Sequence, residues 1–254
     1  QAIGSDLAPQ YSGIADGSAV TTCPYVSLDI TDKAAVSKAL SVLAPDAVVH
    51  CAAWTAVDLA EEADKQDLVR AINAGGTRSI ARVCKALDCK MVYISTDYVF
   101  DGQGERLWEA DDERKPLNVY GMTKYEGELA VQNTLDKYFI VRIAWVFGVN
   151  GKNFVKTMLR LSKEKSSLTV VNDQIGSPTY TKDLAVLLTE MIQTEKYGEY
   201  HATNEGYCSW AEFAAKIMEI SGAETEIIPV TSEEYKTAAV RPKNSRLSKS
   251  ALDK

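Results

Sequence analysis

The sequence is poor in the residues that build metal centres, disulfide frameworks and membrane segments. It has only two histidines, His50 and His201, and five cysteines, an odd number without paired spacing. We therefore expect neither a metal site nor a disulfide scaffold. No apolar run approaches the roughly 20 residues of a membrane-spanning helix, and no signal peptide is visible. These absences predict a cytoplasmic protein that does not enter membranes.

An excess of positive charge is also lacking. The formal net charge is -7, from 28 Lys and Arg against 35 Asp and Glu. Non-specific binding to nucleic acid or to anionic membranes needs a basic surface, so we expect neither partner. A small anionic substrate stays compatible, because a few placed cations and helix N-termini suffice to bind it. The 254 residues, 46% hydrophobic and 25% charged, suit one large globular domain or a domain with a smaller lobe.

Short apolar runs alternate with helical patterns in the first part of the chain. Nearly continuous apolar runs of this kind are typical of strands buried on both faces of a parallel sheet. The runs are residues 47–51, 91–95 and 138–143. Helices are expected after a cap at Asp32, over residues 61–87 with a break at Gly75 and Gly76, and over residues 120–135. This alternation predicts an α/β fold with a doubly wound, Rossmann-like parallel sheet.

The pattern changes after about residue 150, where helices are separated by short β-like pieces. These helices are expected at residues 154–163, 181–194 and 209–221. We expect residues 1–150 to form a dinucleotide-binding domain and residues 151–254 a smaller substrate-binding lobe. Open α/β sheets bind ligands at the carboxyl ends of their strands, so the shared cleft should lie there.

Tyr120 and Lys124 form the first candidate for chemistry. Their i, i+4 spacing places both side chains on one helix face. An ammonium group near a phenol favours the phenolate and lowers a pKa that begins near ~10. Such a tyrosine can give or take a proton near neutral pH. Alone, the pair is a weak signal, because this spacing is frequent by chance on exposed helices.

Two further segments follow predicted strands. Thr96 lies at the carboxyl end of the run 91–95, where its hydroxyl can bond a substrate carbonyl; a polar strand end explains it equally. Ala52 and Ala53 follow the run 47–51, and small residues there let a flat cofactor approach the backbone. Close helix–sheet contact is an equally good explanation for these two alanines.

In order and spacing, these segments resemble the extended short-chain dehydrogenase/reductases, and among them the dTDP-4-dehydrorhamnose reductases. The resemblance extends from about Asp29 to Arg246. Its marks are residues 28–31, 55–58, 95–102, 120–128, 142–148, 153–155, 173–179 and 241–245. It implies an oxidoreductase that uses NADH or NADPH to reduce the 4-keto group of dTDP-4-dehydro-L-rhamnose. The product, dTDP-L-rhamnose, is a precursor of surface polysaccharides.

The resemblance also implies roles for individual residues. Tyr120 would donate the proton, Lys124 would activate it and bind the ribose, and Thr96 would supply the hydroxyl. The residues implied to bind the cofactor are Asp29, Ile30, Ala52, Ala53, Trp54, Tyr120 and Lys124. Those implied to bind or flank the sugar are Thr96, Asp97, Tyr98 and Trp145. Asn73 is the kind of asparagine that supports the active-site helix in this superfamily.

The sequence departs from the family at its beginning. The family opens with a strand and a Gly-x-x-Gly-x-x-Gly turn that holds the pyrophosphate, and nothing between Gln1 and Asp29 supplies one. We expect this sequence to start after that strand and helix, with residues 1–6 ending the second strand. Asp6 would then accept hydrogen bonds from the adenosine ribose and favour NADH over NADPH, although a turn residue is an equal interpretation. Trp54 stands where many members carry histidine.

Two alternatives remain open. Another sugar-nucleotide reductase, dehydratase or epimerase is the first; dehydratases typically carry Thr-Asp-Glu, whereas Tyr98 follows Asp97 here. A non-catalytic regulatory homologue, like the β subunit of methionine adenosyltransferase, is the second. The set of Thr96, Tyr120 and Lys124 favours an enzyme. We expect a monomer or a homodimer.

Overall fold

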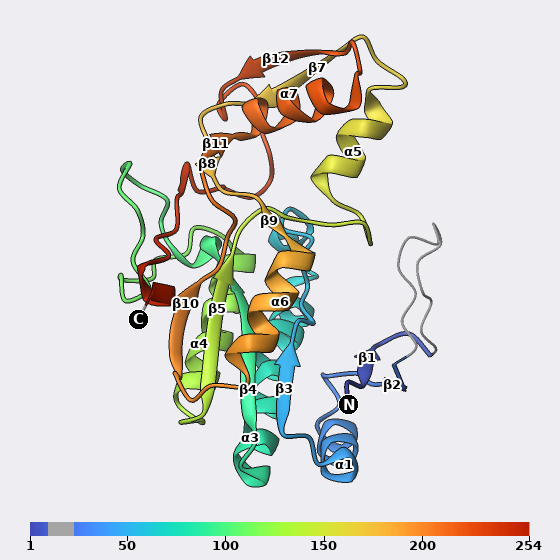
Figure 1. Ribbon diagram of the computed structural model, residues 1–254, viewed down its shortest axis with the longest axis vertical. Helices are drawn as coiled ribbons and strands as arrows, with labels where there is room; N and C mark the ends of the chain where they lie inside the picture. The colour runs from blue at the N-terminus through green and yellow to red at the C-terminus, as the bar shows by residue number, and fades with distance from the viewer. Residues whose placement is uncertain (10–22, 254) are drawn as a thin grey trace.

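The computed structural model describes residues 1–9 and 23–253, and a four-stranded parallel sheet forms its centre (Figure 1). The strand order is β10-β5-β4-β3. The strands are β3 (Ala47–His50), β4 (Lys90–Thr96), β5 (Tyr138–Ile143) and β10 (Gly198–His201). The three predicted apolar runs and the parallel α/β sheet are confirmed, and Thr96 is the last residue of β4.

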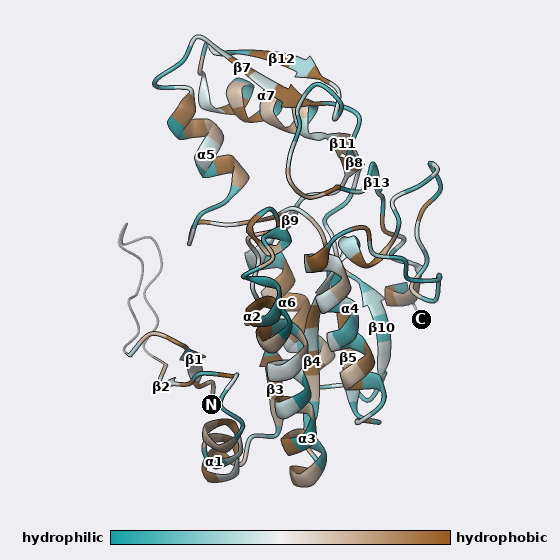
Figure 2. Ribbon diagram, turned by 180° about the vertical axis from the view of Figure 1, so that it is seen from behind, coloured by the Kyte–Doolittle hydropathy of each residue, from teal (hydrophilic) through white to brown (hydrophobic). Residues whose placement is uncertain are grey.

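Helices cover both faces of this sheet. Figure 1 shows α6 (Thr181–Met191) on one face, and Figure 2 shows α3 (Thr77–Leu87) and α4 (Val119–Gln132) on the other. On the α6 side, Val92, Phe139, Val141, Leu188 and Met191 form one core. On the opposite side, Ile80, Cys84, Met91, Tyr93, Val131 and Ile140 form another. Strands with apolar residues on both faces are buried in this way.

The first residues form a separate two-stranded parallel sheet. It pairs β1 (Gly4–Asp6) with β2 (Tyr25–Ser27), and α1 (Lys33–Leu43) follows. The carboxylate of Asp32 caps α1 by accepting hydrogen bonds from the backbone N–H groups of Ala34 and Ala35. A strand that ends at Asp6 and a helix capped by Asp32 are thus both present as predicted.

The expected helix over residues 61–87 differs in its construction. It begins with two short pieces, η1 (Leu59–Glu61) and α2 (Gln66–Arg70), and continues through the π-helical turn η2 (Ala71–Gly76) into α3. Gly75 and Gly76 therefore do not break it. Gly76 packs against Ile30, in the loop before α1. A Cβ on residue 76 would lie 2.7 Å from the Ile30 side chain, so this contact requires glycine. The pair marks a close approach, which the sequence pattern alone cannot distinguish from a turn.

The second lobe lies beyond the carboxyl ends of the sheet (Figure 1). It contains α5 (Phe154–Leu161) and α7 (Trp210–Ser221), which pack against the strand pair β7 (Ser167–Val171) and β12 (Glu226–Val230). Short strands join the lobes: β6 (Val146–Phe147), β8 (Ile175–Gly176), β9 (Thr179–Tyr180), β11 (Cys208–Ser209) and β13 (Asn244–Ser245). Two 3-10 turns, η3 (Asp97–Val99) and η4 (Ser250–Asp253), complete the described elements.

The residues after 150 do not all lie in this second lobe. Strand β10 pairs in parallel with β5, and α6 packs on the central sheet. The chain thus leaves the first lobe after β5, returns for α6 and β10, and leaves again for α7. A division at residue 150 misses this return, because β-like pieces of two or four residues do not reveal their partners. Within the described residues, every helix is too short or too polar to cross a membrane.

Candidate active site

A cavity of about 520 Å³ lies between the lobes, at the carboxyl ends of β4 and β5. Open α/β sheets bind ligands at this edge. Seven residues singled out from the sequence line it: Ala53, Thr96, Asp97, Tyr98, Tyr120, Lys124 and Trp145. The fold therefore brings together side chains that are up to 92 positions apart in the chain, between Ala53 and Trp145.

The first turn of α4 holds Tyr120 at the cavity. Asn118 caps the helix by accepting a hydrogen bond from the N–H of Gly121 at 2.8 Å. The carboxylate of Glu61 accepts one from the N–H of Val119, also at 2.8 Å. Gly121 has no side chain to collide with the carbonyl oxygen of Tyr98, so the helix can approach the end of β4 closely. Tyr120 thus reaches the side chain of Thr96. The rings of Tyr120 and Tyr98 meet edge to face, with their centroids 5.5 Å apart.

The phenol of Tyr120 is protonated at neutral pH in this structure. Burial raises its pKa to about 12, and the nearby Asp97 adds to the increase, whereas a hydrogen bond with Thr96 opposes it. The expected lowering of this pKa by Lys124 is not found. The ammonium of Lys124 instead donates a hydrogen bond to the carbonyl oxygen of Ile94, at 2.7 Å. Burial is the larger effect here, because it penalises the phenolate directly.

Lys124 is enclosed beneath the cavity. Its side chain is buried, and its Nζ lies 4.1 Å from the centre of the Tyr93 ring. Burial lowers its pKa to about 7, while the negative charge of Glu128 raises it. His50 lies near, and burial lowers the pKa of this imidazole to about 3, so it is neutral. The charge of Lys124 near neutral pH therefore depends on its anionic neighbour.

Thr96 and Asp97 form a hydrogen-bonded unit at the end of β4. The hydroxyl of Thr96 donates to Oδ1 of Asp97 at 3.0 Å and accepts from the N–H of Tyr98 at 3.2 Å. The hydroxyl of Ser245, on β13, donates to the other carboxylate oxygen. Burial raises the pKa of Asp97 to about 6. Ser245 lies in one of the segments that carry the resemblance, but no local pattern indicates a contact between residues 148 positions apart.

Trp145 leaves β5 in a left-handed conformation, with φ of 51°. Such a φ is uncommon for a residue other than glycine, and strained residues of this kind occur often at functional sites. Its indole stacks on that of Trp210, the first residue of α7, and covers Gly176. Trp210 and Phe154 also line the cavity and were not predicted. An aromatic residue at the start of an amphipathic helix is usually part of a core, so their positions gave no signal.

Five residues expected at the cofactor do not line this cavity: Asp6, Asp29, Ile30, Ala52 and Trp54. Asp6 and Asp29 are exposed at the ends of β1 and β2. Hydrogen bonds from Thr31 lower the pKa of Asp29. Asp6 ends β1, Asp29 follows β2, and Ala52 and Trp54 follow β3, so they lie at the carboxyl ends of their strands.

Asn73 connects the loop after β3 with the active-site helix. Its side-chain amide accepts a hydrogen bond from the N–H of Trp54 at 2.8 Å and donates to the carbonyl of Trp54 at 3.3 Å. The same amide donates to Thr123 on α4, at 3.0 Å. This is the supporting position that the resemblance implied for Asn73.

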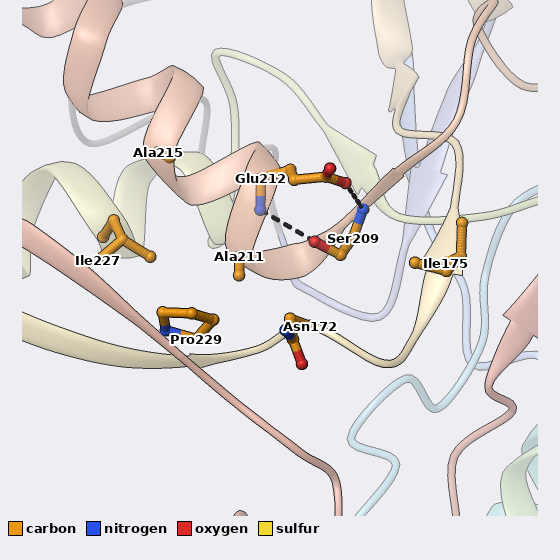
Figure 3. A pocket seen from close by; sticks show the side chains of 8 residues that line it. All are labelled: Asn172, Ile175, Ser209, Ala211, Glu212, Ala215, Ile227 and Pro229. Carbon is orange, nitrogen blue, oxygen red and sulfur yellow. Dashed lines mark hydrogen bonds between the residues drawn. The ribbon is translucent and has the colours of Figure 1, made fainter.

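Two other cavities lie beside or beyond this one. The first, of about 330 Å³, shares Tyr98, Phe154 and Trp210 with it and extends into the second lobe toward Arg241. The second, of about 380 Å³, lies between α7 and the strands of the second lobe, and Figure 3 shows its walls. Its polar side chains Ser209 and Glu212 cap α7 reciprocally, at 3.1 and 2.6 Å. They are therefore committed to the fold rather than to a ligand.

The parallel sheet, the Tyr and Lys one turn apart on α4, and the threonine at the end of β4 together define a short-chain dehydrogenase/reductase. Comparison with known proteins narrows this class. The family model described as RmlD substrate binding domain matches residues 1–254. The spore coat polysaccharide biosynthesis protein SpsK of Bacillus subtilis is 44% identical, over 89% of this chain and 79% of that protein.

Relatives with a named activity agree. A dTDP-4-dehydrorhamnose reductase of Streptomyces griseus is 43% identical, over 92% of this chain and 79% of its own length. The crystal structure of dTDP-4-dehydrorhamnose reductase from Bacillus anthracis, in complex with NADP, superposes with a TM-score of 0.90 at 40% identity. The alignment covers 99% of this chain and 91% of that one. The chain belongs to the RmlD family of dTDP-4-dehydrorhamnose reductases.

Proposed function

We propose that this protein uses NADH or NADPH to reduce the 4-keto group of dTDP-4-dehydro-L-rhamnose, forming dTDP-L-rhamnose. The observation that carries the proposal is the meeting of Thr96, Tyr120 and Lys124 in one cavity between the lobes. The names of relatives at 38–43% identity support the substrate. The sequence favours a cytoplasmic location for the enzyme. It also favours a monomer or a homodimer.

The residues of the cleft fit a nicotinamide dinucleotide. Lys124 donates one hydrogen bond to the carbonyl of Ile94, which leaves ammonium hydrogens for a ribose hydroxyl. Ala53 is small and half-buried, so a flat ring can approach the backbone there. We place the adenosine end near Asp6, Asp29 and Ile30, and the stretch between along Ala52 and Trp54. When bound, the reduced nicotinamide supplies a hydride.

The chain itself handles the proton and the oxygen. The raised pKa of Tyr120, about 12, keeps the phenol protonated, as a proton donor for reduction must be. Tyr120 gives this proton to the sugar oxygen as negative charge develops on it. Thr96 turns its hydroxyl from Asp97 to that same oxygen and stabilises the charge. The lobes surround the cavity, so little water competes with these donors.

The cavity of about 330 Å³ beside the catalytic one offers a place for the nucleotide part of the substrate. It opens from the catalytic cavity across Tyr98 and contains the guanidinium of Arg241 and the ring of Tyr235. A guanidinium suits a diphosphate, and an aromatic ring can stack on a base. Asp58 holds Arg241 with two hydrogen bonds, at 3.0 and 2.5 Å, and so orients it.

The geometry disfavours elimination of water, the reaction of the related dehydratases. Tyr98 follows Asp97 where a second acid would stand, and burial raises its pKa well above the ordinary range. A phenol of that kind does not exchange protons readily near neutral pH. A non-catalytic regulatory homologue would not need the proton donor Tyr120 beside Thr96, so this pair favours an enzyme.

A turnover assay tests the proposal. Purified protein is mixed with dTDP-4-dehydro-L-rhamnose and either NADH or NADPH. We expect loss of the reduced nicotinamide and formation of dTDP-L-rhamnose in equal amounts. Elimination products, or stable dinucleotide binding without any oxidation, would contradict the proposed reaction and would favour a dehydratase or a regulatory homologue, respectively.

A further inference from the structure

A buried cluster of charges lies behind the active-site helix. Glu128 of α4 and Arg142 of β5 are both fully buried and form two hydrogen bonds, each 2.8 Å long. Arg142 also donates to Glu199 of β10 at 2.6 Å, and Arg114 contacts both carboxylates. Two carboxylates and two guanidinium groups balance one another in charge. Burying ions is costly, and apolar residues often replace such clusters without loss of stability, so stability alone does not account for this cluster.

Glu128 joins the helix to the catalytic end of the sheet. Oε1 of Glu128 accepts a hydrogen bond of 2.5 Å from the hydroxyl of Ser95, which directly precedes Thr96 in β4. Arg142, its other partner, lies opposite Ser95 in the pairing of β4 with β5. One carboxylate thus fixes α4 to both strands, one residue from Thr96. Since Tyr120 and Lys124 lie on the same helix, two turns and one turn before Glu128, this contact sets their distance from Thr96.

Glu128 is also the carboxylate whose negative charge raises the pKa of Lys124. From α4 itself, Lys124 faces Glu128 and the protonated Tyr120. From β4 it faces the Tyr93 ring, whose hydroxyl stays protonated because burial raises its pKa. From β3 and the loop after it, it faces neutral His50 and the thiol of Cys51, whose pKa burial raises. Arg142, Arg114 and Glu199, the other charges of the cluster, are not among the groups that shift the pKa of Lys124.

We propose that Glu128 is a positioning residue for the reduction: it holds α4 in register with Thr96 and supplies the negative charge that keeps Lys124 a cation. The inference rests on the proposed function, because it concerns the same reaction. Glu128 touches neither the cavity nor the substrate, so it acts through Lys124 and Ser95.

The matched variants are Glu128→Gln and Glu199→Gln. Each removes one carboxylate that binds Arg142 while preserving side-chain shape, but Glu199 is not among the charges that act on Lys124. Both proteins are first compared with the wild type by thermal unfolding. The pH dependence of kcat/KM for the sugar is then measured at saturating NADPH, and the affinity for NADPH is measured by its fluorescence over the same pH range.

The sign of the expected shift follows from the charge. Activity and dinucleotide affinity fall as pH rises through the pKa of Lys124, since the ammonium is lost. Removing a neighbouring negative charge favours the neutral amine, so Glu128→Gln should move both alkaline limbs to lower pH. The expected shift is about one pH unit, as for a nearby opposite charge. Glu199→Gln should leave both limbs in place.

The proposal would be overturned if the alkaline limbs of Glu128→Gln and Glu199→Gln lay at the same pH and both variants only lost stability. Glu128 would then be a structural residue. Glu128→Asp keeps the charge and should restore the alkaline limbs, even where kcat stays low because the shorter side chain loses Ser95. Glu128→Asp also tests the proposal if Glu128→Gln does not fold. An alkaline limb of the Glu128→Asp profile that lies about one pH unit below that of the wild type would refute the proposal, because this variant keeps the negative charge. A wild type without turnover would refute the proposed function instead, and the NADPH affinities would still decide the role of Glu128.

Discussion

The indoles of Trp145 and Trp210 stack with their centroids 3.8 Å apart and their planes 18° apart. Trp145 lies two residues after strand β5 of the central sheet, and Trp210 begins helix α7 of the second lobe. The stack thus joins the two lobes at the wall of the cavity where Tyr120 and Thr96 meet. The position of the second lobe over the catalytic residues depends on this contact.

Replacing Trp210 with alanine should therefore raise the KM for the sugar nucleotide about tenfold. An aromatic pair contributes about 0.5–1.5 kcal/mol beyond area burial, and about 1.4 kcal/mol corresponds to tenfold. Trp145→Ala should do the same, while the KM for NADPH changes less. Trp108→Ala is the control, because Trp108 stacks on Phe100 outside the cavity. Steady-state kinetics in which the affinities for both ligands fall equally would mark Trp145 and Trp210 as core residues only.

Gly176 supports this stack from below. A Cβ at this position would lie 3.0 Å from two atoms of the Trp145 ring, so Gly176→Ala should push the indole toward the cavity. We expect a higher KM for the sugar nucleotide and little change in the KM for NADPH. Gly75→Ala is the matched control, since a Cβ there meets only the carbonyl of Arg70, at 3.8 Å. An unchanged KM for the sugar nucleotide in Gly176→Ala would show that substrate binding does not depend on the position of the Trp145 indole.

Asp97 makes the stability of the protein depend on pH. Its pKa in the folded state is about 6, above the ordinary value of 3.8, because burial disfavours its charge. The folded protein therefore binds this proton more tightly than the unfolded chain, and the stability that it contributes is lost as pH rises through about 6. Asp97→Asn lacks this titration, so its melting temperature relative to the wild type should rise between pH 4 and 7. A constant difference across that range would contradict the raised pKa.

Binding of the nucleotide by Arg241 should depend on the planar, two-pronged shape of its guanidinium. It donates two hydrogen bonds to Asp58 and lines the cavity of about 330 Å³ beside the catalytic one. Arg241→Lys keeps the charge but cannot form the pair of bonds, so binding of dTDP should weaken by about tenfold, within the range for a charge-assisted hydrogen bond. Lys243→Arg, which alters an exposed cation that binds Asp173, is the control. Equal affinities for dTDP in isothermal titration would place the nucleotide elsewhere.

The sequence was sufficient for those parts of the site that lie close to regular elements. Thr96 follows an apolar strand and Tyr120 and Lys124 share a helix face, so local patterns and a parallel sheet predicted their meeting. Ser245, Trp210 and Arg241 reach the site from late segments without a periodic signal, and the return of β10 to the first lobe rests on a four-residue strand. The pKa of Tyr120 was expected to be lowered, because the pair with Lys124 is visible in the sequence and burial is not.

The central claim is that Tyr120 donates the proton in a nicotinamide-dependent reduction, and the Tyr120→Phe variant tests it most directly. The single-turnover rate of sugar reduction is measured at saturating NADPH, beside the binding affinity for NADPH. General acid catalysis typically contributes ~100- to 10,000-fold, so we expect a loss of that size with folding and cofactor affinity nearly intact. A variant that keeps more than about a tenth of the wild-type rate would contradict the account, because that loss is smaller than a proton donor's contribution.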